Sequence, residues 1–327
     1  MNEQTQLCLQ RFIENRDRIK SVFSWDSGLI HLSCAGIYTA KDKTVDIRML
    51  QNCKDLLKQK VSVFSNFRST ARTPITAMMA VSENPEQTLD NGLIVYELLK
   101  KDFWGSEYLP LAAMIIAQMA QLDEYERIAS RTRSIYNSMK AVHPFLTSSE
   151  DSALCALLSL SEQPDDVLLR DSEECYRILK PHFFSANAVQ SLSHVLALCD
   201  GYAESKCERT MELFNKLKLS GYKYGTDYEL PTLGILATSG GNLDSIVADI
   251  VEINTWLASQ KGFGFFSSIS TKQRLMYAGI LAQKEYYQND TMQNAAINGT
   301  ISLIIAQEVA MCVAISASAS ASAAASD

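Results

Sequence analysis

The stretch that decides the fold is Phe145 to His182, FLTSSEDSALCALLSLSEQPDDVLLRDSEECYRILKPH. Thr147 and Glu150 have the spacing of a capping box, in which a hydroxyl and a carboxylate satisfy free amides at a helix start. Three apolar side chains then follow at helical spacing, namely Leu154, Leu157 and Leu158. The first half of the stretch therefore predicts an amphipathic helix with one buried stripe.

The second half of the stretch predicts another helix. Pro164 suits the first turn of a helix, and Pro181 disfavours helical backbone at the residue before it. Between them, Leu168, Cys175 and Leu179 lie on one helical face. Neither helix can bury its apolar stripe alone, so each must pack on neighbouring helices.

Roughly the same unit is repeated along the chain. Aligned on the aromatic residue before the first helix, the units begin at intervals of 38 to 42 residues, at Phe23, Phe64, Phe103, Phe145, Phe183, Tyr222 and Phe263. A regular period with two helices per period is typical of helical repeat proteins, and its length is nearer HEAT-type repeats than tetratricopeptide repeats. We predict an all-α fold, a right-handed α-solenoid-like stack of about seven helical hairpins with a period near 40 residues. The alternative is an ordinary helical bundle with helices of even length.

The pattern divides the chain into three segments. Residues 1–22 are predicted to form an N-terminal capping helix, and residues 23–315 the helical-hairpin array. Within the array, Ile297 to Ile315 is strongly apolar but interrupted by polar residues, which favours a final helix covering the open end over a membrane span. Residues 316–327 form a Ser/Ala-rich tail that we expect to be disordered.

The composition of the chain argues against several kinds of protein. The net charge of −7 and the pI of about 5.3 argue against a nucleic-acid binder, which normally has a basic footprint. The eight cysteines include no CxxC pair, so neither a disulfide framework nor a zinc site is expected. Because the first residues lack the pattern of a signal peptide, we expect a cytoplasmic protein.

The N-terminal units carry the densest polar features. Arg68 and Arg72 are four residues apart at a predicted helix start, where two guanidinium groups could bind a phosphate or carboxylate. Glu107 occupies the position of Arg68 one unit later, so we favour a structural ion pair between Arg68 and Glu107. Trp104 and Tyr108 could form an aromatic recognition surface, although packing between units explains them more simply.

No sequence motif for a nucleophile, a phosphate loop, a dinucleotide or a metal is present, so we predict no catalytic residue, cofactor or metal site. We expect a non-enzymatic binding or scaffold protein. Its expected partner is a protein or peptide, and we expect it to bind neither nucleic acid nor a membrane. Its candidate surface comprises Arg68, Arg72, Trp104, Glu107 and Tyr108. The alternative is an enzyme with an unrecognised site near Arg68 and Glu107.

Three stretches carry a family resemblance: Phe64-Ser65-Asn66-Phe67-Arg68-Ser69, Lys101-Asp102-Phe103-Trp104-Gly105-Ser106-Glu107-Tyr108 and Gly262-Phe263-Gly264-Phe265-Phe266. Apart from the Ser/Ala tail, the whole chain resembles the bacterial family named domain of unknown function four thousand and three. The resemblance implies a bacterial, soluble protein. It implies no activity, cofactor or catalytic residue.

Overall fold

The structure is a computed structural model that describes residues 1–101, 103, 106–264 and 267–286. Within these ranges every regular element is an α-helix or a short 3-10 helix, and no strand is present. The all-α prediction is therefore confirmed. Trp104, the predicted final helix over Ile297 to Ile315 and the tail 316–327 lie outside the described residues.

The chain divides into two compact units. Among the described residues, unit 1 comprises Met1–Leu9, 162–264 and 267–286, and unit 2 comprises the remainder of the chain up to Ser161. Helix α1 (Glu3–Val22) has its first residues in unit 1 and the others in unit 2.

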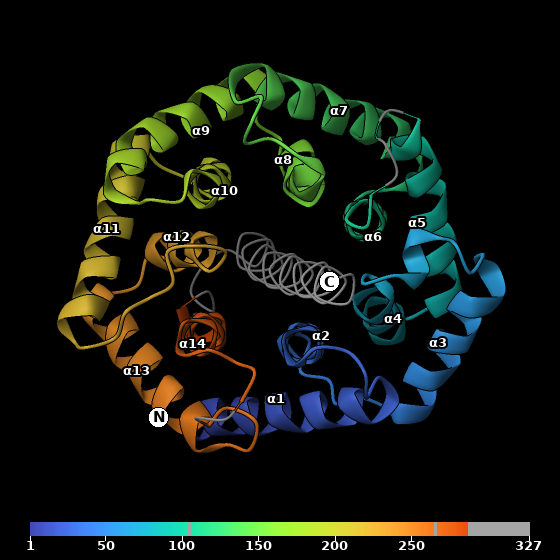
Figure 1. The fold of residues 1–327 in the computed structure, drawn as a ribbon, viewed down its shortest axis with the longest axis horizontal. Helices are drawn as coiled ribbons and strands as arrows, with labels where there is room; N and C mark the ends of the chain where they lie inside the picture. The colour runs from blue at the N-terminus through green and yellow to red at the C-terminus, as the bar shows by residue number, and fades with distance from the viewer. Residues whose placement is uncertain (102, 104–105, 265–266, 287–327) are drawn as a thin grey trace, which may run out of the picture. The chain divides into compact units, whose positions relative to one another are not determined.

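Unit 2 contains, after α1, the helices α2 (Gly28–Ala40), α3 (Ile47–Lys60), η1 (Asn66–Arg68), α4 (Arg72–Val81), α5 (Pro85–Lys100), α6 (Leu109–Met119), η2 (Leu122–Glu124), α7 (Tyr125–Val142), η3 (Ser149–Asp151) and α8 (Ser152–Leu160). The short helices α2, α4, α6 and α8 form one row, in which each contacts the next (Figure 1). The longer helices α3, α5 and α7 form a second row, and they pack on α4, α6 and α8 respectively.

Unit 1 contains α9 (Asp165–Leu179), η4 (Lys180–His182), α10 (Ala186–Ala197), α11 (Ala203–Leu219), α12 (Leu230–Thr238), α13 (Leu243–Ser259) and α14 (Thr271–Tyr286). Here α12 contacts both α10 and α14, whereas α11 contacts both α9 and α13. In both units a long helix packs on the helix that follows it.

The two kinds of helix differ in how they are buried. Helix α8, with the sequence SALCALLSL, buries every residue except Leu160, as a helix that is apolar all round must. Helix α9 buries only one stripe, formed by Leu168, Ser172, Cys175 and Leu179. The predicted buried positions in both halves of the deciding stretch are therefore confirmed.

The capping box lies one residue later than predicted. The carboxylate of Asp151 accepts a hydrogen bond from the backbone N–H of Ser148 at 2.8 Å, and the Ser148 hydroxyl accepts one from the N–H of Glu150 at 3.3 Å. Thr147 belongs to the preceding turn, because its N–H donates to the carbonyl oxygen of His143 at 3.0 Å. The prediction of a capping box between Thr147 and Glu150 was wrong because the turn after α7 is one residue longer than expected.

Candidate functional site

The loops that precede the short helices of unit 2 lie side by side. The side-chain amide of Asn66 donates to the carbonyl oxygen of Ser106 at 3.0 Å, and the Thr70 hydroxyl donates to the Glu107 carboxylate at 2.7 Å. These bonds join the loop before α4 to the loop before α6. Since the chain reverses twice between α6 and α8, which are in contact, the loop before α8 lies at the same end of the row. We call residues 20–27, 58–71, 100–101, 103, 106–108 and 140–151 the loop edge.

Arg72, the first residue of α4, has a structural partner at this edge. Its guanidinium Nη2 lies 2.9 Å from Oδ1 of Asp26, a carboxylate that also accepts a hydrogen bond from the Thr73 hydroxyl. The guanidinium carbon lies 5.4 Å from the centroid of the Phe23 ring. The contacts of Arg72 therefore anchor the loop before α2 to the start of α4.

The predicted ion pair between Arg68 and Glu107 is not formed. Arg68 is the last residue of the 3-10 turn η1. The Glu107 carboxylate accepts a hydrogen bond from Thr70, two residues later, and not from Arg68. Within the described ranges Arg68 has no ion-pair partner. The prediction was wrong because an equal offset between units does not fix the backbone path through the turn.

Tyr108 is buried at the N-terminal end of α6. Together with Arg68, Arg72 and Glu107 it lies at or next to the loop edge, so the structure brings four of the five candidate residues to one end of unit 2. The fifth, Trp104, is outside the described residues.

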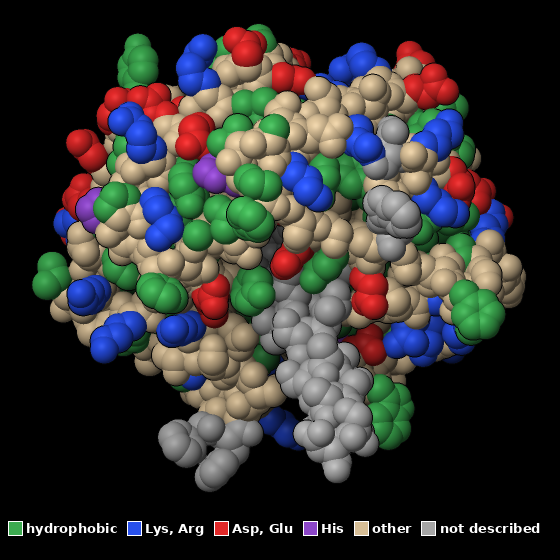
Figure 2. Space-filling view, turned by 45° about the horizontal axis from the view of Figure 1, so that its top comes forward, with side chains coloured by type: hydrophobic (Ala, Val, Ile, Leu, Met, Phe, Trp, Pro, Cys, Tyr) green, Lys and Arg blue, Asp and Glu red, His purple; other side chains and the backbone are tan. Residues whose placement is uncertain are grey.

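Sequence reasoning missed the exposed aromatic residues of this edge. Trp25 is 97% exposed, Phe64 is 94% exposed and Phe145 is 98% exposed. Apolar side chains that project singly from the surface are visible in Figure 2. The spacing of Trp25, Phe64 and Phe145 follows the repeat period, and this was the available signal. It was overlooked because Phe64 and Phe145 were aligned with Phe23, Phe103 and Phe183, which are buried.

Charge is divided between the two ends of the long helices in unit 2. Their last turns carry basic side chains, namely Lys20, Lys58, Lys60, Lys100 and Lys140. Their N-terminal ends carry acidic ones, namely Asp46, Glu86, Glu124 and Glu126. This arrangement complements the helix dipoles. It also makes the loop edge the basic end of an otherwise acidic chain.

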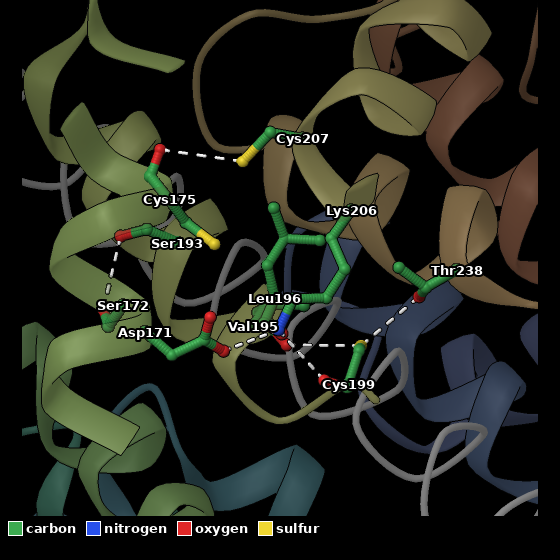
Figure 3. Close-up of polar contacts among 10 residues, drawn as sticks. All are labelled: Asp171, Ser172, Cys175, Ser193, Val195, Leu196, Cys199, Lys206, Cys207 and Thr238. Carbon is green, nitrogen blue, oxygen red and sulfur yellow. Dashed lines mark hydrogen bonds and ion pairs between the residues drawn. The ribbon is translucent and has the colours of Figure 1, made fainter. Parts of the chain in front are cut away.

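Unit 1 contains a buried ion pair that the sequence did not reveal (Figure 3). Lys206, on α11, is 4% exposed, and its ammonium donates to the Asp171 carboxylate at 2.6 Å. The same ammonium donates to the carbonyl oxygens of Leu196 at 2.8 Å and Cys199 at 3.1 Å. All three donors of the ammonium are used, so Lys206 ties α9 and the end of α10 to α11 and has no donor left for a ligand.

The thiols beside this ion pair are buried. Burial raises the pKa of the Cys199 thiol, which accepts a hydrogen bond from Thr238 at 3.3 Å. The Cys207 thiol donates to the carbonyl oxygen of Cys175 at 3.8 Å. A raised pKa keeps a thiol protonated and poorly nucleophilic, so Cys199 is a packing residue.

The described residues offer neither a metal-binding cluster nor a helix that could span a membrane. They contain no group of three or more His, Cys, Asp and Glu side chains that could hold a metal ion. They also contain no helix with the length and apolar character needed to cross a membrane.

Comparison with known proteins places the chain beside one family. A family model described as "Protein of unknown function (DUF4003)" matches residues 15–310. A relative from Bacillus subtilis (strain 168), "Uncharacterized protein YeaA", is 23% identical over 242 residues, which are 72% of this chain and 72% of the relative. No solved structure matches the chain significantly.

Proposed function

The chain belongs to the family described as Protein of unknown function (DUF4003), and on that premise we propose that it is a non-enzymatic binding or scaffold protein with a protein or peptide partner. Its working surface is the loop edge of unit 2, and it acts in the bacterial cytoplasm. The net charge of −7 argues against nucleic acid as the partner.

The proposed scaffold is a right-handed α-solenoid-like array of about seven hairpins over residues 23–315, preceded by a capping helix over residues 1–22. Two arginines that lie nearly two predicted periods apart support it. Arg131 on α7 donates to the carbonyl oxygen of Ser159, and Arg209 on α11 donates to that of Ala237. Each acceptor lies 28 residues after its arginine, at the end of a short helix. The same contact in two hairpins is what a repeat predicts.

The observation that carries the proposal is the full exposure of Trp25, Phe64 and Phe145 at equivalent loops. Burying a large aromatic side chain is favourable, and these three side chains contribute almost no buried surface to the fold. The short helices, by contrast, are buried on nearly all faces and offer little surface for a partner. Exposed aromatic residues are enriched where proteins bind one another.

The enzyme alternative near Arg68 and Glu107 has less support. Glu107 accepts a hydrogen bond from Thr70, and Arg72 is paired with Asp26. Both contacts join neighbouring loops, so they stabilise the fold. A catalytic site instead needs polar groups that converge on a space for a substrate.

The test is affinity capture from the native cell with quantitative mass spectrometry. The edge variant carries Trp25→Ser, Phe64→Ser and Phe145→Ser. The matched control variant carries Ile47→Ser, Met119→Ser and Leu122→Ser, which are exposed apolar residues at the other ends of these helices. We expect a specific set of proteins to be captured by wild type and the control variant, and recovery to fall at least about tenfold with the edge variant. Equal recovery with all three proteins would contradict the proposal.

A further inference from the structure

The acidic side chains of the loop edge are largely engaged within the protein. Asp26 is paired with Arg72, Glu107 accepts the Thr70 hydroxyl, and Asp151 is buried with its carboxylate on the N–H of Ser148. Their negative charge is therefore partly neutralised or withdrawn from solvent.

Several basic side chains of the same edge have no such partner. Lys20 and Lys101 are exposed, Arg68 is half-buried, and none of the three forms an ion pair among the described residues. The ammonium of Lys140 lies 5.6 Å from the centroid of the Tyr136 ring. The loop edge thus presents positive charge to a partner.

The exposed aromatic residues lie on separate loops of one row of helices. Each of Trp25, Phe64 and Phe145 projects from a different loop, and adjacent packed helices are about 10 Å apart. An extended peptide advances about 3.3 Å per residue, so it passes from one hairpin to the next in about three residues. A chain lying along the row therefore brings about every third side chain next to a loop tip.

We propose that the loop edge of unit 2 binds an extended acidic segment of a partner protein, whose apolar side chains pack against Trp25, Phe64 and Phe145, about three residues apart between Trp25 and Phe64 and about six between Phe64 and Phe145. Carboxylates between these apolar residues face Lys20, Arg68 and Lys101. The inference rests on the proposed function, because it names the partner of the same surface.

Charge distribution favours a narrow partner over an anionic bilayer. The chain has a net charge of −7, and a bilayer extends past the loop edge to the rest of the protein. A peptide that follows the edge experiences mainly the charges within a Debye length, about 8 Å at physiological ionic strength. The loop edge therefore attracts an anionic peptide, whereas the chain as a whole repels an anionic bilayer.

The test is fluorescence anisotropy with labelled peptides of about twelve residues, a length that spans about four hairpins. The main probe repeats Glu-Asp-Leu, and the matched probes repeat Glu-Asp-Ser and Lys-Lys-Leu. We expect the Glu-Asp-Leu peptide to bind wild type and the control variant, and to bind the edge variant at least about tenfold more weakly. Its affinity should fall with salt, and the variant with Lys20→Gln, Arg68→Gln and Lys101→Gln should lose most of that dependence.

Three outcomes would overturn the inference. They are equal binding of Glu-Asp-Leu to the edge variant, equal binding of the Lys-Lys-Leu peptide to wild type, and tighter adsorption to phosphatidylglycerol vesicles than to the acidic peptide. If no acidic peptide binds while the edge variant still loses its captured proteins, the inference fails and the proposed function stands. If capture is also unchanged, both fail.

Discussion

The α7–α8 pair of unit 2 and the α11–α12 pair of unit 1 share one arginine contact and differ at one buried position. In both pairs an arginine of the long helix donates to carbonyl oxygens at the end of the short helix. Arg131 reaches Ser159 and Ser161, and Arg209 reaches Ala237 and Gly241. The shared contact satisfies carbonyls that a helix end leaves free.

The pairs differ one turn earlier on the long helix. Ile128 is a buried apolar residue of α7, whereas Lys206, at the matching position of α11, is buried as an ammonium held by Asp171 and two carbonyl groups. The comparison teaches that a buried position in this framework accepts a charge only when the neighbouring helices supply every hydrogen bond that the charge needs.

The largest expected effect comes from separating this ion pair. We expect Asp171→Ala to lower the free energy of unfolding by about 3 to 5 kcal/mol, because it leaves the Lys206 ammonium buried without a counterion. Adding Lys206→Met should recover part of the loss, since Ile128 shows that an apolar side chain fits the matching position. Urea unfolding measures both changes. Glu174→Ala, which removes a long surface pair with Arg177 on the same helix, is the control and should cost less than about 1 kcal/mol.

The second effect is a pH dependence at Asp151. Burial raises the pKa of this carboxyl from 3.8 to about 7 in the folded protein. The folded state therefore binds the proton more tightly than the unfolded state, so its stabilisation is complete below about pH 3.8 and is lost as the pH rises through about 7. The stability of wild type relative to Asp151→Asn should fall by roughly 2 to 4 kcal/mol between about pH 4 and 8.

This pH dependence also sharpens the comparison of the two pairs. Glu229 occupies the position of Asp151 before α12, and burial raises its pKa as well. We expect Glu229→Gln to reduce the pH dependence of unfolding in the same direction. Glu126→Gln, at an exposed position of α7, is the control variant. A stability that rises with pH relative to Asp151→Asn would refute the burial argument.

The arginine contacts should give intermediate and similar effects. Arg131→Met and Arg209→Met each leave carbonyl oxygens at the end of a short helix without a charged donor, which we expect to cost about 1 to 3 kcal/mol. Arg127→Met removes an exposed pair with Glu124 and should cost less than about 1 kcal/mol. Thermal unfolding of the three variants measures the difference. Unequal losses for Arg131 and Arg209 would show that the two pairs are not equivalent.

The smallest effect on stability is expected from removing the Ser159 hydroxyl or adding one at Ala237, the matching position of the other pair. The Ser159 hydroxyl lies 2.8 Å from that of Thr132, whereas Ala237 has no hydroxyl to meet Thr210. We expect Ser159→Ala to cost about 1 kcal/mol, the usual net value of a buried hydrogen bond. Ala237→Ser should change stability by less than about 1 kcal/mol, because Thr210 already donates to the carbonyl oxygen of Lys206 at 2.7 Å. A loss above that size with Ala237→Ser would mean that the hydroxyl finds no partner.

The sequence predicted the helices well and the site only in outline. Burial of Leu154, Leu157 and Leu158, and of Leu168, Cys175 and Leu179, followed from helical spacing alone. The candidate residues Arg68, Arg72, Glu107 and Tyr108 lie at or next to one edge of unit 2. Their partners were not, because Arg72 binds Asp26 and Glu107 binds Thr70 through contacts between residues more than thirty positions apart.

What the sequence determined by itself is therefore local. The helical spacing of apolar residues fixes which face of each helix is buried, because that preference acts within a few turns of one helix. Tertiary structure alone decided which aromatic residues are buried. Phe103 is buried and Phe145 is exposed, although both precede short helices at nearly equal spacing. Their burial depends on the path of each loop over the neighbouring helices, and that path is set by contacts between residues far apart in the chain.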